Sequence, residues 1–170
     1  LQRYFTKDDI FFFFFRWHCY EVHSELSDAD AEVVLSKLNQ ILLDTQKQLQ
    51  QATHIIITYG TSWVYRHIET NAIVANCHKV PQKQFTKELL TVTTIQESIE
   101  NTICLIESLN PNCNFIFTVS PVRHLKDGFV ENQLSKAHLI TAIHQILKSE
   151  ICNLKSVIYF PSYEIMMDEL

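Results

Sequence analysis

Residues 54–59 are His-Ile-Ile-Ile-Thr-Tyr, and Gly60 follows them directly. A continuous β-branched and apolar run of this length is typical of a strand that is buried on both faces, as in a parallel sheet. Two later runs have the same character, Phe115 to Val119 and Ser156 to Phe160, and Pro161 ends the second of them. The three runs together predict the central sheet of the protein.

Helical patterns lie between these strands. Ser27 is a suitable N-cap, and apolar residues recur at helical spacing from Ala31 to about Gln50. The same periodicity predicts helices at residues 95–109 and 134–147, and a further helix is expected after Pro161. Strands that alternate with helices predict the α/β class, here a three-layer α/β/α sandwich with a mostly parallel sheet.

Length and composition predict one domain over residues 1–170, with 46% hydrophobic and 19% charged residues. Within it, residues 1–26 are expected to be irregular and residues 73–75 to form a short strand. The net charge of −5 leaves no basic footprint, so we expect no nucleic-acid partner. Gly60 and Gly128 are the only glycines, which argues against the Gly-rich loops that bind nucleotide cofactors.

The cysteines and the apolar run near the N-terminus indicate the cellular compartment of the protein. The chain has five cysteines and no CxxC pair, which argues against a disulfide framework or a zinc ribbon. Reduced thiols fit a reducing compartment, so we expect a cytoplasmic location. The apolar run from Ile10 to Phe15 is much too short to cross a bilayer, so we expect no membrane span. Because the chain starts at Leu1 without a methionine and stops at Leu170 inside a helical pattern, we expect a fragment of a longer protein.

Gly60, Thr61 and Ser62 follow the first predicted strand. At the carboxyl edge of a parallel sheet, such a turn can donate hydrogen bonds to an oxyanion that forms during acyl transfer. The alternative is a turn that only ends the strand, with Ser62 capping a helical turn through Tyr65.

A first polar cluster is Asn76-Cys77-His78-Lys79. A cysteine beside a histidine suggests a thiol nucleophile, but adjacent side chains of an extended segment point to opposite faces. A buried, inert Cys77 is therefore the preferred interpretation. His78 and Lys79 are better candidates for positioning a substrate, and the alternative is a loop that Asn76 holds in place.

A second polar cluster follows the second strand and contains Ser120, Arg123 and His124. The planar fork of Arg123 suits a carboxylate or a phosphate, and His124 could act as a general base near neutral pH. A long loop predicted from Leu125 to Gln133, which includes Asn132, favours a functional interpretation. The alternative is that Arg123 pairs with an acidic residue and that His124 only packs in the loop.

Ser135 and Lys136 begin the third predicted helix. They could bind an anion at the helix N-terminus, but capping is the simpler interpretation. Adjacent helix residues do not face each other, and the spacing differs from that of Ser-x-x-Lys enzymes.

The spacing of histidines and carboxylates in this chain gives little support for a metal site. His138 and His144 are six residues apart, which does not fit the i, i+4 pair of a helical metal site. Glu164 and Asp168 share one face of the last helix, where a solvated face is the simpler interpretation. We therefore expect no metal site.

Four segments together resemble the bacterial GSCFA-domain family. They are residues 76–81 (Asn-Cys-His-Lys-Val-Pro), 120–128 (Ser-Pro-Val-Arg-His-Leu-Lys-Asp-Gly), 135–137 (Ser-Lys-Ala) and 159–164 (Tyr-Phe-Pro-Ser-Tyr-Glu). The resemblance covers about Trp17 to Leu170. It implies a branch of the SGNH (GDSL-like) hydrolases with a flavodoxin-like α/β/α fold. Such enzymes hydrolyse or transfer acyl esters with a serine nucleophile and a histidine base, without a metal or other cofactor.

The chain departs from the family pattern at two points. The Gly-Ser-Cys-Phe-Ala motif, which would carry the nucleophilic serine, does not occur in it. The resemblance places that motif before Leu1 and the catalytic histidine beyond Leu170. The turn Gly60-Thr61-Ser62 resembles the superfamily block that supplies an oxyanion-hole amide, with Ser62 in place of the usual asparagine.

The leading hypothesis is therefore an SGNH-like esterase or acyltransferase that acts on a small-molecule or carbohydrate ester. Its catalytic group would be Gly60, Ser62, His78 and His124, and its substrate-binding group would be Asn76, Lys79, Ser120, Arg123, Asn132, Ser135 and Lys136. The rival hypothesis is a non-catalytic module that binds a carbohydrate or an anion. In that module Arg123, Lys79 and Lys136 would hold the anion, and Trp63 or Trp17 would stack on a sugar.

Overall fold

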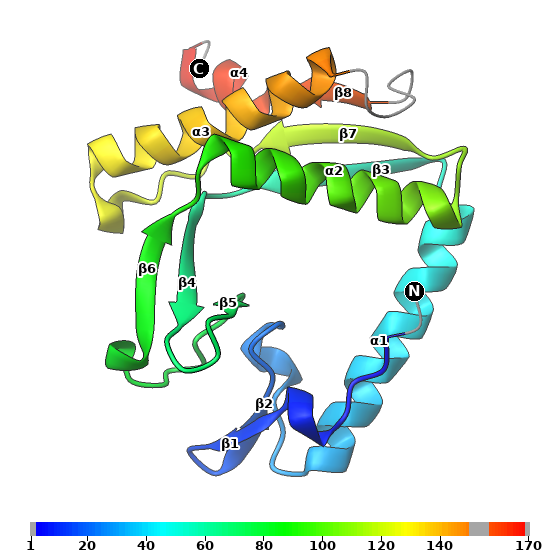
Figure 1. Cartoon of the computed structure of the whole chain (residues 1–170), viewed down its shortest axis with the longest axis vertical. Helices are drawn as coiled ribbons and strands as arrows, with labels where there is room; N and C mark the ends of the chain where they lie inside the picture. Colours follow the sequence, from blue (N-terminus) through cyan, green and yellow to red (C-terminus); the bar gives the residue numbers. More distant parts are fainter. Residues whose placement is uncertain (1–2, 150–156, 169–170) are drawn as a thin grey trace. The chain divides into compact units, whose positions relative to one another are not determined.

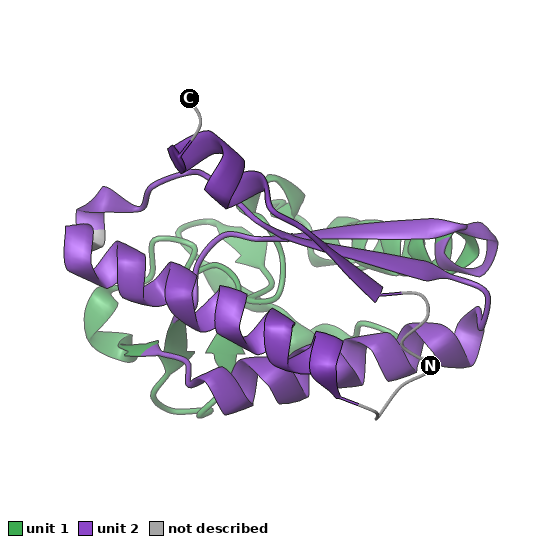
Figure 2. Ribbon diagram, turned by 90° about the horizontal axis from the view of Figure 1, so that it is seen from above, with its two compact units in different colours: residues 1–48, 64–88 green, residues 49–63, 89–170 purple. Residues whose placement is uncertain are grey.

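A computed structural model describes residues 3–149 and 157–168 of the chain. It divides the chain into two compact units, which Figure 2 shows in different colours. Unit 1 comprises Leu1–Gln48 and Val64–Glu88, and unit 2 comprises Leu49–Trp63 and Leu89–Leu170. Each unit is described by itself, and the prediction of one domain over residues 1–170 stays a prediction.

Unit 2 contains the predicted parallel sheet. Its strands are β3 (His54–Tyr59), β7 (Asn114–Val119) and β8 (Val157–Phe160), in the order β3-β7-β8. Both pairings are parallel, and they align Ile56 with Ile116 and Ile116 with Ile158. The predicted α/β class is therefore confirmed. Ser156, the first residue of the third predicted strand, lies outside the described residues.

Helices cover one face of this sheet. Figure 1 shows α2 (Val92–Leu109) and α3 (Phe129–Lys148) side by side along the strands. Ile103 of α2, Ile143 of α3, and Phe115 and Phe117 of β7 are all fully buried in one core. The alternation of side chains along β7 places Phe115 and Phe117 on the same face of the sheet. Burial of this face, at about 25 cal/mol per Å² of apolar surface, holds the helices on the sheet.

The start of α3 corrects one prediction. Residues 125–133 do not form a long loop, because a 3-10 helix at Leu125–Asp127 (η4) is followed at once by α3 from Phe129. Gly128, with φ of 111°, is the N-cap of α3, and its carbonyl oxygen accepts a hydrogen bond from the N–H of Asn132 at 3.1 Å. The first turn of α3 has no apolar periodicity, since Phe129 and Val130 are 71% and 75% exposed. A last short helix, α4 (Ser162–Asp168), follows β8 as expected.

Unit 1 contains the elements that the hydrophobic pattern did not predict. A hairpin of β1 (Phe11–Phe13) and β2 (Arg16–His18) lies in the region expected to be irregular, so that prediction is wrong. Phe14 and Phe15 form its turn with φ of 45° and 63°. These are left-handed angles that hairpin turns usually give to Asn and Gly, which explains why the turn is not visible in the sequence.

The rest of unit 1 contains one long helix and a second sheet. The helix α1 (Ala31–Gln51) confirms the predicted one, and its last turn belongs to unit 2. Its N-cap is Asp30 and not Ser27, since Oδ1 of Asp30 accepts a hydrogen bond from the N–H of Glu32 at 2.8 Å. The second sheet has the order β5-β4-β6, with β4 (Trp63–His67), β5 (Ile73–Val74) and β6 (Phe85–Leu89). Short 3-10 helices lie at Lys7–Asp9 (η1), Ser24–Leu26 (η2) and Gln82–Gln84 (η3). None of the described helices is both long enough and apolar enough to cross a membrane.

Candidate functional site

The candidate site lies in unit 2, where β3 and β7 end. Gly60 directly follows β3 and Ser120 directly follows β7. The N–H of Ser120 donates to the carbonyl oxygen of Tyr59 at 2.9 Å, so the ladder between the two strands continues to this point. Because the strands are parallel, the residues after both of them meet at the carboxyl edge of the sheet, where ligands bind in open α/β sheets.

Lys136 of α3 joins these two strand ends. Its side chain is only 1% exposed, and Nζ donates to the carbonyl oxygens of Gly60 and Ser120, both at 2.6 Å. No carboxylate of the described residues pairs with it. Burial lowers the pKa of the Lys136 ammonium, because removal from water disfavours the charged form. The site is therefore built around a buried amine whose hydrogen bonds hold two turns together.

Ser135 anchors the turn after β3 to α3. Its Oγ accepts a hydrogen bond from the N–H of Ser62 at 2.8 Å and lies 2.9 Å from Oγ1 of Thr61. The hydroxyl of Ser62 in turn donates to the carbonyl oxygen of Ser135 at 3.1 Å. Ser62 and Ser135 are both buried. The N–H of Ser62 is thus occupied in this state, whereas the N–H of Thr61 donates to no residue that the structure describes.

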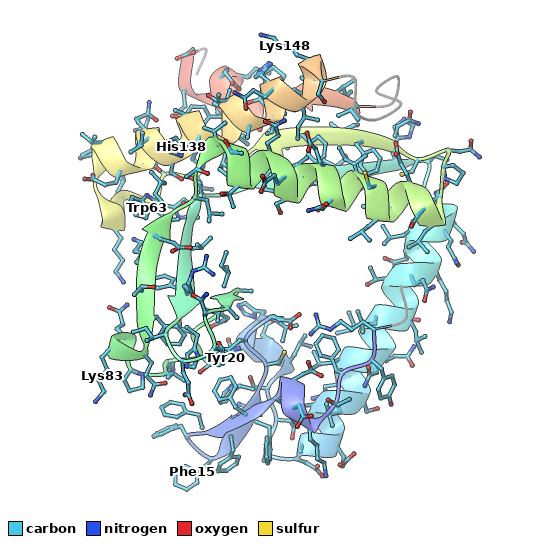
Figure 3. All side chains as sticks on the ribbon, in the orientation of Figure 1. Phe15, Tyr20, Trp63, Lys83, His138 and Lys148 are labelled. Atoms are coloured by element: carbon cyan, nitrogen blue, oxygen red, sulfur yellow. The ribbon has the colours of Figure 1, made fainter. Side chains whose placement is uncertain are left out.

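The segment after Ser62 does not form the helical turn through Tyr65 that was the alternative interpretation of this region. Residues 63–67 form strand β4 and not a helical turn. Oγ1 of Thr61, and not Ser62, accepts a hydrogen bond from the N–H of Trp63 at 3.1 Å. The indole Nε1 of Trp63 donates to the carbonyl oxygen of Glu131 at 3.2 Å, near the start of α3. Figure 3 shows Trp63 at that end of α3 and Lys148 at the other.

His124 and Asn132 complete the group around Gly60. Oδ1 of the buried Asn132 accepts a hydrogen bond from the N–H of His124 at 2.8 Å. The imidazole lies against Gly60, since a Cβ built on this glycine would be 3.7 Å from Nε2 of His124. Ser120 stabilises its own loop by accepting a hydrogen bond from the N–H of Val122 at 3.2 Å. The residues of the second polar cluster therefore converge with the turn after β3.

A pocket of about 340 Å³ lies beside this group in unit 2. Its lining residues are Arg123, Leu125, Phe129, Asn132, Gln133, Tyr163, Met167 and Asp168. Among the described residues, the only hydrogen bond of the Arg123 guanidinium is from Nη2 to Sδ of Met167, at 3.2 Å. Arg123 therefore has no carboxylate partner among the described residues, and the alternative that it pairs with an acidic residue elsewhere stays a prediction.

Six of the eight residues that line the pocket were not among the predicted site residues, and Gln133 and Tyr163 are two of them. The hydroxyl of Tyr163 donates to Oε1 of Gln133, and the ring of Tyr163 lies 5.8 Å from Nζ of Lys136. Tyr163 thus connects the buried amine with the pocket. The signal in the sequence was the segment Tyr-Phe-Pro-Ser-Tyr-Glu, which carried part of the family resemblance without a role for its second tyrosine.

The first polar cluster belongs to unit 1, and its side chains bond to backbone groups of its own loop and of the segment at Cys19. Oδ1 of Asn76 accepts a hydrogen bond from the N–H of His78 at 2.8 Å. Nε2 of His78 donates to the carbonyl oxygen of Cys19 at 2.7 Å, and the ring is buried. His78 and Lys79 have φ of 48° and 62°, so the loop turns sharply at both. The assignment of Asn76, His78 and Lys79 to a substrate site stays a prediction.

The surroundings of Cys77 and His78 favour the neutral forms of both side chains. Burial raises the pKa of the Cys77 thiol, which disfavours the thiolate that a nucleophile needs. The pKa of His78 is lowered, mainly because its ring is removed from water. Nδ1 of His78 is buried and has no hydrogen-bond partner among the described residues. Within the described ranges, no group of three or more His, Cys, Asp or Glu residues could hold a metal ion.

Comparison with known proteins gives one match. The sequence model of the GSCFA family matches residues 1–170. No curated protein and no solved structure matches the chain.

Proposed function

The chain belongs to the GSCFA family, and we propose that it forms the pocket region of an SGNH-like hydrolase that cleaves or transfers acyl esters. The observation that supports this proposal is the convergence of Gly60, Thr61, Ser120 and His124 around the buried Lys136 at the carboxyl edge of a parallel sheet. This edge is the usual ligand site of open α/β sheets.

The electrostatics suits acyl transfer. Attack on an ester places negative charge on the carbonyl oxygen, and donors that already point at this position lower the barrier. The N–H of Thr61 is the candidate donor, because the N–H of Ser62 is occupied by Ser135. The Lys136 ammonium contacts the carbonyl of Gly60, next to this turn, so its positive charge adds to the stabilisation of an oxyanion.

The proposal assigns the remaining steps to a serine and a histidine outside these 170 residues. In the proposed mechanism, a serine hydroxyl attacks the ester carbonyl and passes its proton to a histidine, which then protonates the departing alcohol. Water or an acceptor hydroxyl releases the acyl group by the same steps in reverse. His124 and Asn132 line the space next to Gly60 and position the substrate.

The test is labelling with a fluorophosphonate, which reacts preferentially with activated serines. A longer form of the protein, extended at both ends, is labelled, and the modified residue is mapped by mass spectrometry. We expect one labelled serine upstream of Leu1. Absence of labelling in protein whose folding is verified by circular dichroism would refute the proposal.

A matched pair of variants sharpens the experiment. Lys136→Met removes the buried charge at similar length, whereas Lys148→Met changes an exposed lysine near the other end of the same helix. We expect slower labelling for Lys136→Met and an unchanged rate for Lys148→Met. Equal rates in all three proteins would remove Lys136 from the mechanism.

A second candidate function is a binding module without catalysis. The observation in its favour is Arg123, which borders a pocket and has no carboxylate partner among the described residues. Saturable binding of an anion, together with no labelling of any serine in the longer protein, would favour this alternative over the hydrolase.

A further inference from the structure

The pocket beside Arg123 has a charge pattern that points to one class of ligand. Arg123 supplies one positive charge at its wall, and Asp168 supplies one negative charge. The two form no ion pair with each other or with any other residue in the described ranges. A guanidinium has five N–H donors, so one contact with a thioether leaves most of its capacity for a ligand.

Two further features favour a negatively charged group near Arg123. The first five residues of α3 contribute Phe129, Asn132 and Gln133 to the pocket. The N-terminal end of a helix carries partial positive charge, which the carboxylate of Glu131 in the first turn offsets in part. The Lys136 ammonium lies behind Tyr163, 5.8 Å from the ring that lines the pocket. Both add positive potential, so an anion is favoured even though Asp168 is present.

The size and the walls of the pocket restrict the rest of the ligand. The pocket has a volume of about 340 Å³. This is the low end of the range for ligand pockets. Leu125, Phe129 and Met167 supply apolar walls. Such a pocket fits a small body with a short alkyl chain or one aromatic ring.

We propose that this pocket binds a singly charged carboxylate with a short apolar body. Arg123 pairs with the carboxylate in its fork, and the three apolar side chains cover the body of the ligand. A doubly charged phosphate is disfavoured, because one arginine cannot neutralise it and Asp168 repels the second charge. Resting on the proposed function, this identifies the substrate as an ester that also carries one free carboxylate.

The experiment measures equilibrium binding, which needs no turnover. Hexanoate is titrated into the 170-residue chain and followed by calorimetry and by amide chemical shifts, with hexanamide and inorganic phosphate as comparison ligands. We expect saturable binding of hexanoate, and binding of hexanamide and of phosphate that is weaker by about tenfold or more, as the loss of one charge-assisted hydrogen-bond pair implies.

Three variants test the roles of the charges. Arg123→Met should weaken hexanoate binding by about tenfold or more, whereas Lys148→Met near the far end of α3 should leave it unchanged. Asp168→Asn removes the repelling carboxylate and should strengthen binding by about two- to threefold. Because Arg123 and Asp168 are exposed, both variants should keep the thermal melting curve of the original chain.

Several outcomes would overturn the inference. They are absence of saturable hexanoate binding to folded protein, hexanamide that binds as tightly as hexanoate, or an Arg123→Met variant that binds normally. The labelling test separates this failure from failure of the proposed function. A labelled serine without hexanoate binding refutes the carboxylate pocket alone, and hexanoate binding without a labelled serine leaves the pocket and refutes the hydrolase.

Discussion

The polar loop of unit 1 at residues 76–79 and the polar loop of unit 2 at residues 120–124 have similar compositions but use them differently. Each contains one histidine beside a cation, His78-Lys79 and Arg123-His124. In unit 1 the side chain of Asn76 and the ring of His78 form hydrogen bonds with backbone groups. In unit 2 the loop is held from outside by Asn132 and Lys136 of α3.

This difference teaches which polar loop can bind a ligand. A loop whose side chains bond to backbone groups, as those of Asn76 and His78 do, has fewer of them left for a ligand. A loop that a neighbouring helix holds in place can present an arginine such as Arg123 to a pocket. Removal of a holding contact should therefore cost stability, whereas removal of the presented arginine should cost binding alone.

The largest effect is expected at Lys136. Lys136→Met leaves the carbonyl oxygens of Gly60 and Ser120 without their donor and should lower the free energy of unfolding by about 3 kcal/mol. Urea denaturation measures this loss. Lys148→Met, the control on the same helix, should stay within about 0.5 kcal/mol of the original chain. If the two variants were equally stable, the idea that α3 holds the strand ends would fail.

A smaller loss is expected at Ser135. Ser135→Ala removes the acceptor of the buried Ser62 N–H and should lower the free energy of unfolding by about 2 kcal/mol. Ser149→Ala is a suitable control, because within the described ranges the hydroxyl of Ser149 donates only to the carbonyl oxygen of Ile146 at the end of the helix, 2.9 Å away. Denaturation curves for the two variants that coincide would contradict the anchoring role of Ser135.

His78 sharpens the comparison from the side of unit 1. His78→Phe keeps a ring but removes the donor to Cys19, and we expect a loss of about 1 kcal/mol near neutral pH with hexanoate binding unchanged. Reduced hexanoate binding in a folded His78→Phe protein would break the comparison, because it would give the unit 1 loop a part in the ligand site.

His78 also predicts a pH dependence. Burial lowers its pKa from the ordinary value of 6.5, so the unfolded chain binds the proton at a higher pH than the folded chain does. Stability should therefore be complete above about pH 6.5 and should fall as the pH drops below it. Melting temperatures over this range should vary less for His78→Phe than for the original chain. The exposed control His54→Phe should keep the full pH dependence.

The smallest effect on stability is expected at Arg123. Arg123→Met should change the free energy of unfolding by less than about 0.5 kcal/mol, since the side chain is exposed and its one hydrogen bond among the described residues is with a thioether. Loss of hexanoate binding with unchanged stability would show that Arg123 contacts the ligand and does not stabilise the loop. A large loss of stability would instead show that Arg123 stabilises the loop, as Asn132 and Lys136 do.

Most of unit 2 could be predicted from the sequence. The run at residues 54–59 became β3 with the same bounds, because β-branched residues favour strands. The expected burial on both faces was wrong, since His54, Ile56 and Thr58 on one face are exposed. The helix predicted at residues 95–109 became Val92–Leu109, since its isoleucines face one core. The first turn of α3 escaped prediction, because its apolar residues are exposed and show no periodicity.

Unit 1 was harder to predict for a physical reason. Strand β4 has a nearly uniform half-buried pattern, so it shows neither the alternation of a one-sided strand nor the apolar run of a buried one. The hairpin β1-β2 turns through two phenylalanines with positive φ, for which the sequence offers none of the usual Gly or Asn signals.

By itself, the sequence determined the α/β class, the two strands whose ends carry the site and the polar residues that follow them, because periodicity and strand ends are local properties. Only the tertiary structure decided how each polar group is used. The two carbonyl groups that Lys136 contacts lie 16 and 76 residues away from it along the chain. Whether Arg123 has a carboxylate partner likewise depends on residues far from it in the sequence. Such long-range contacts are fixed by packing, and no local pattern encodes them.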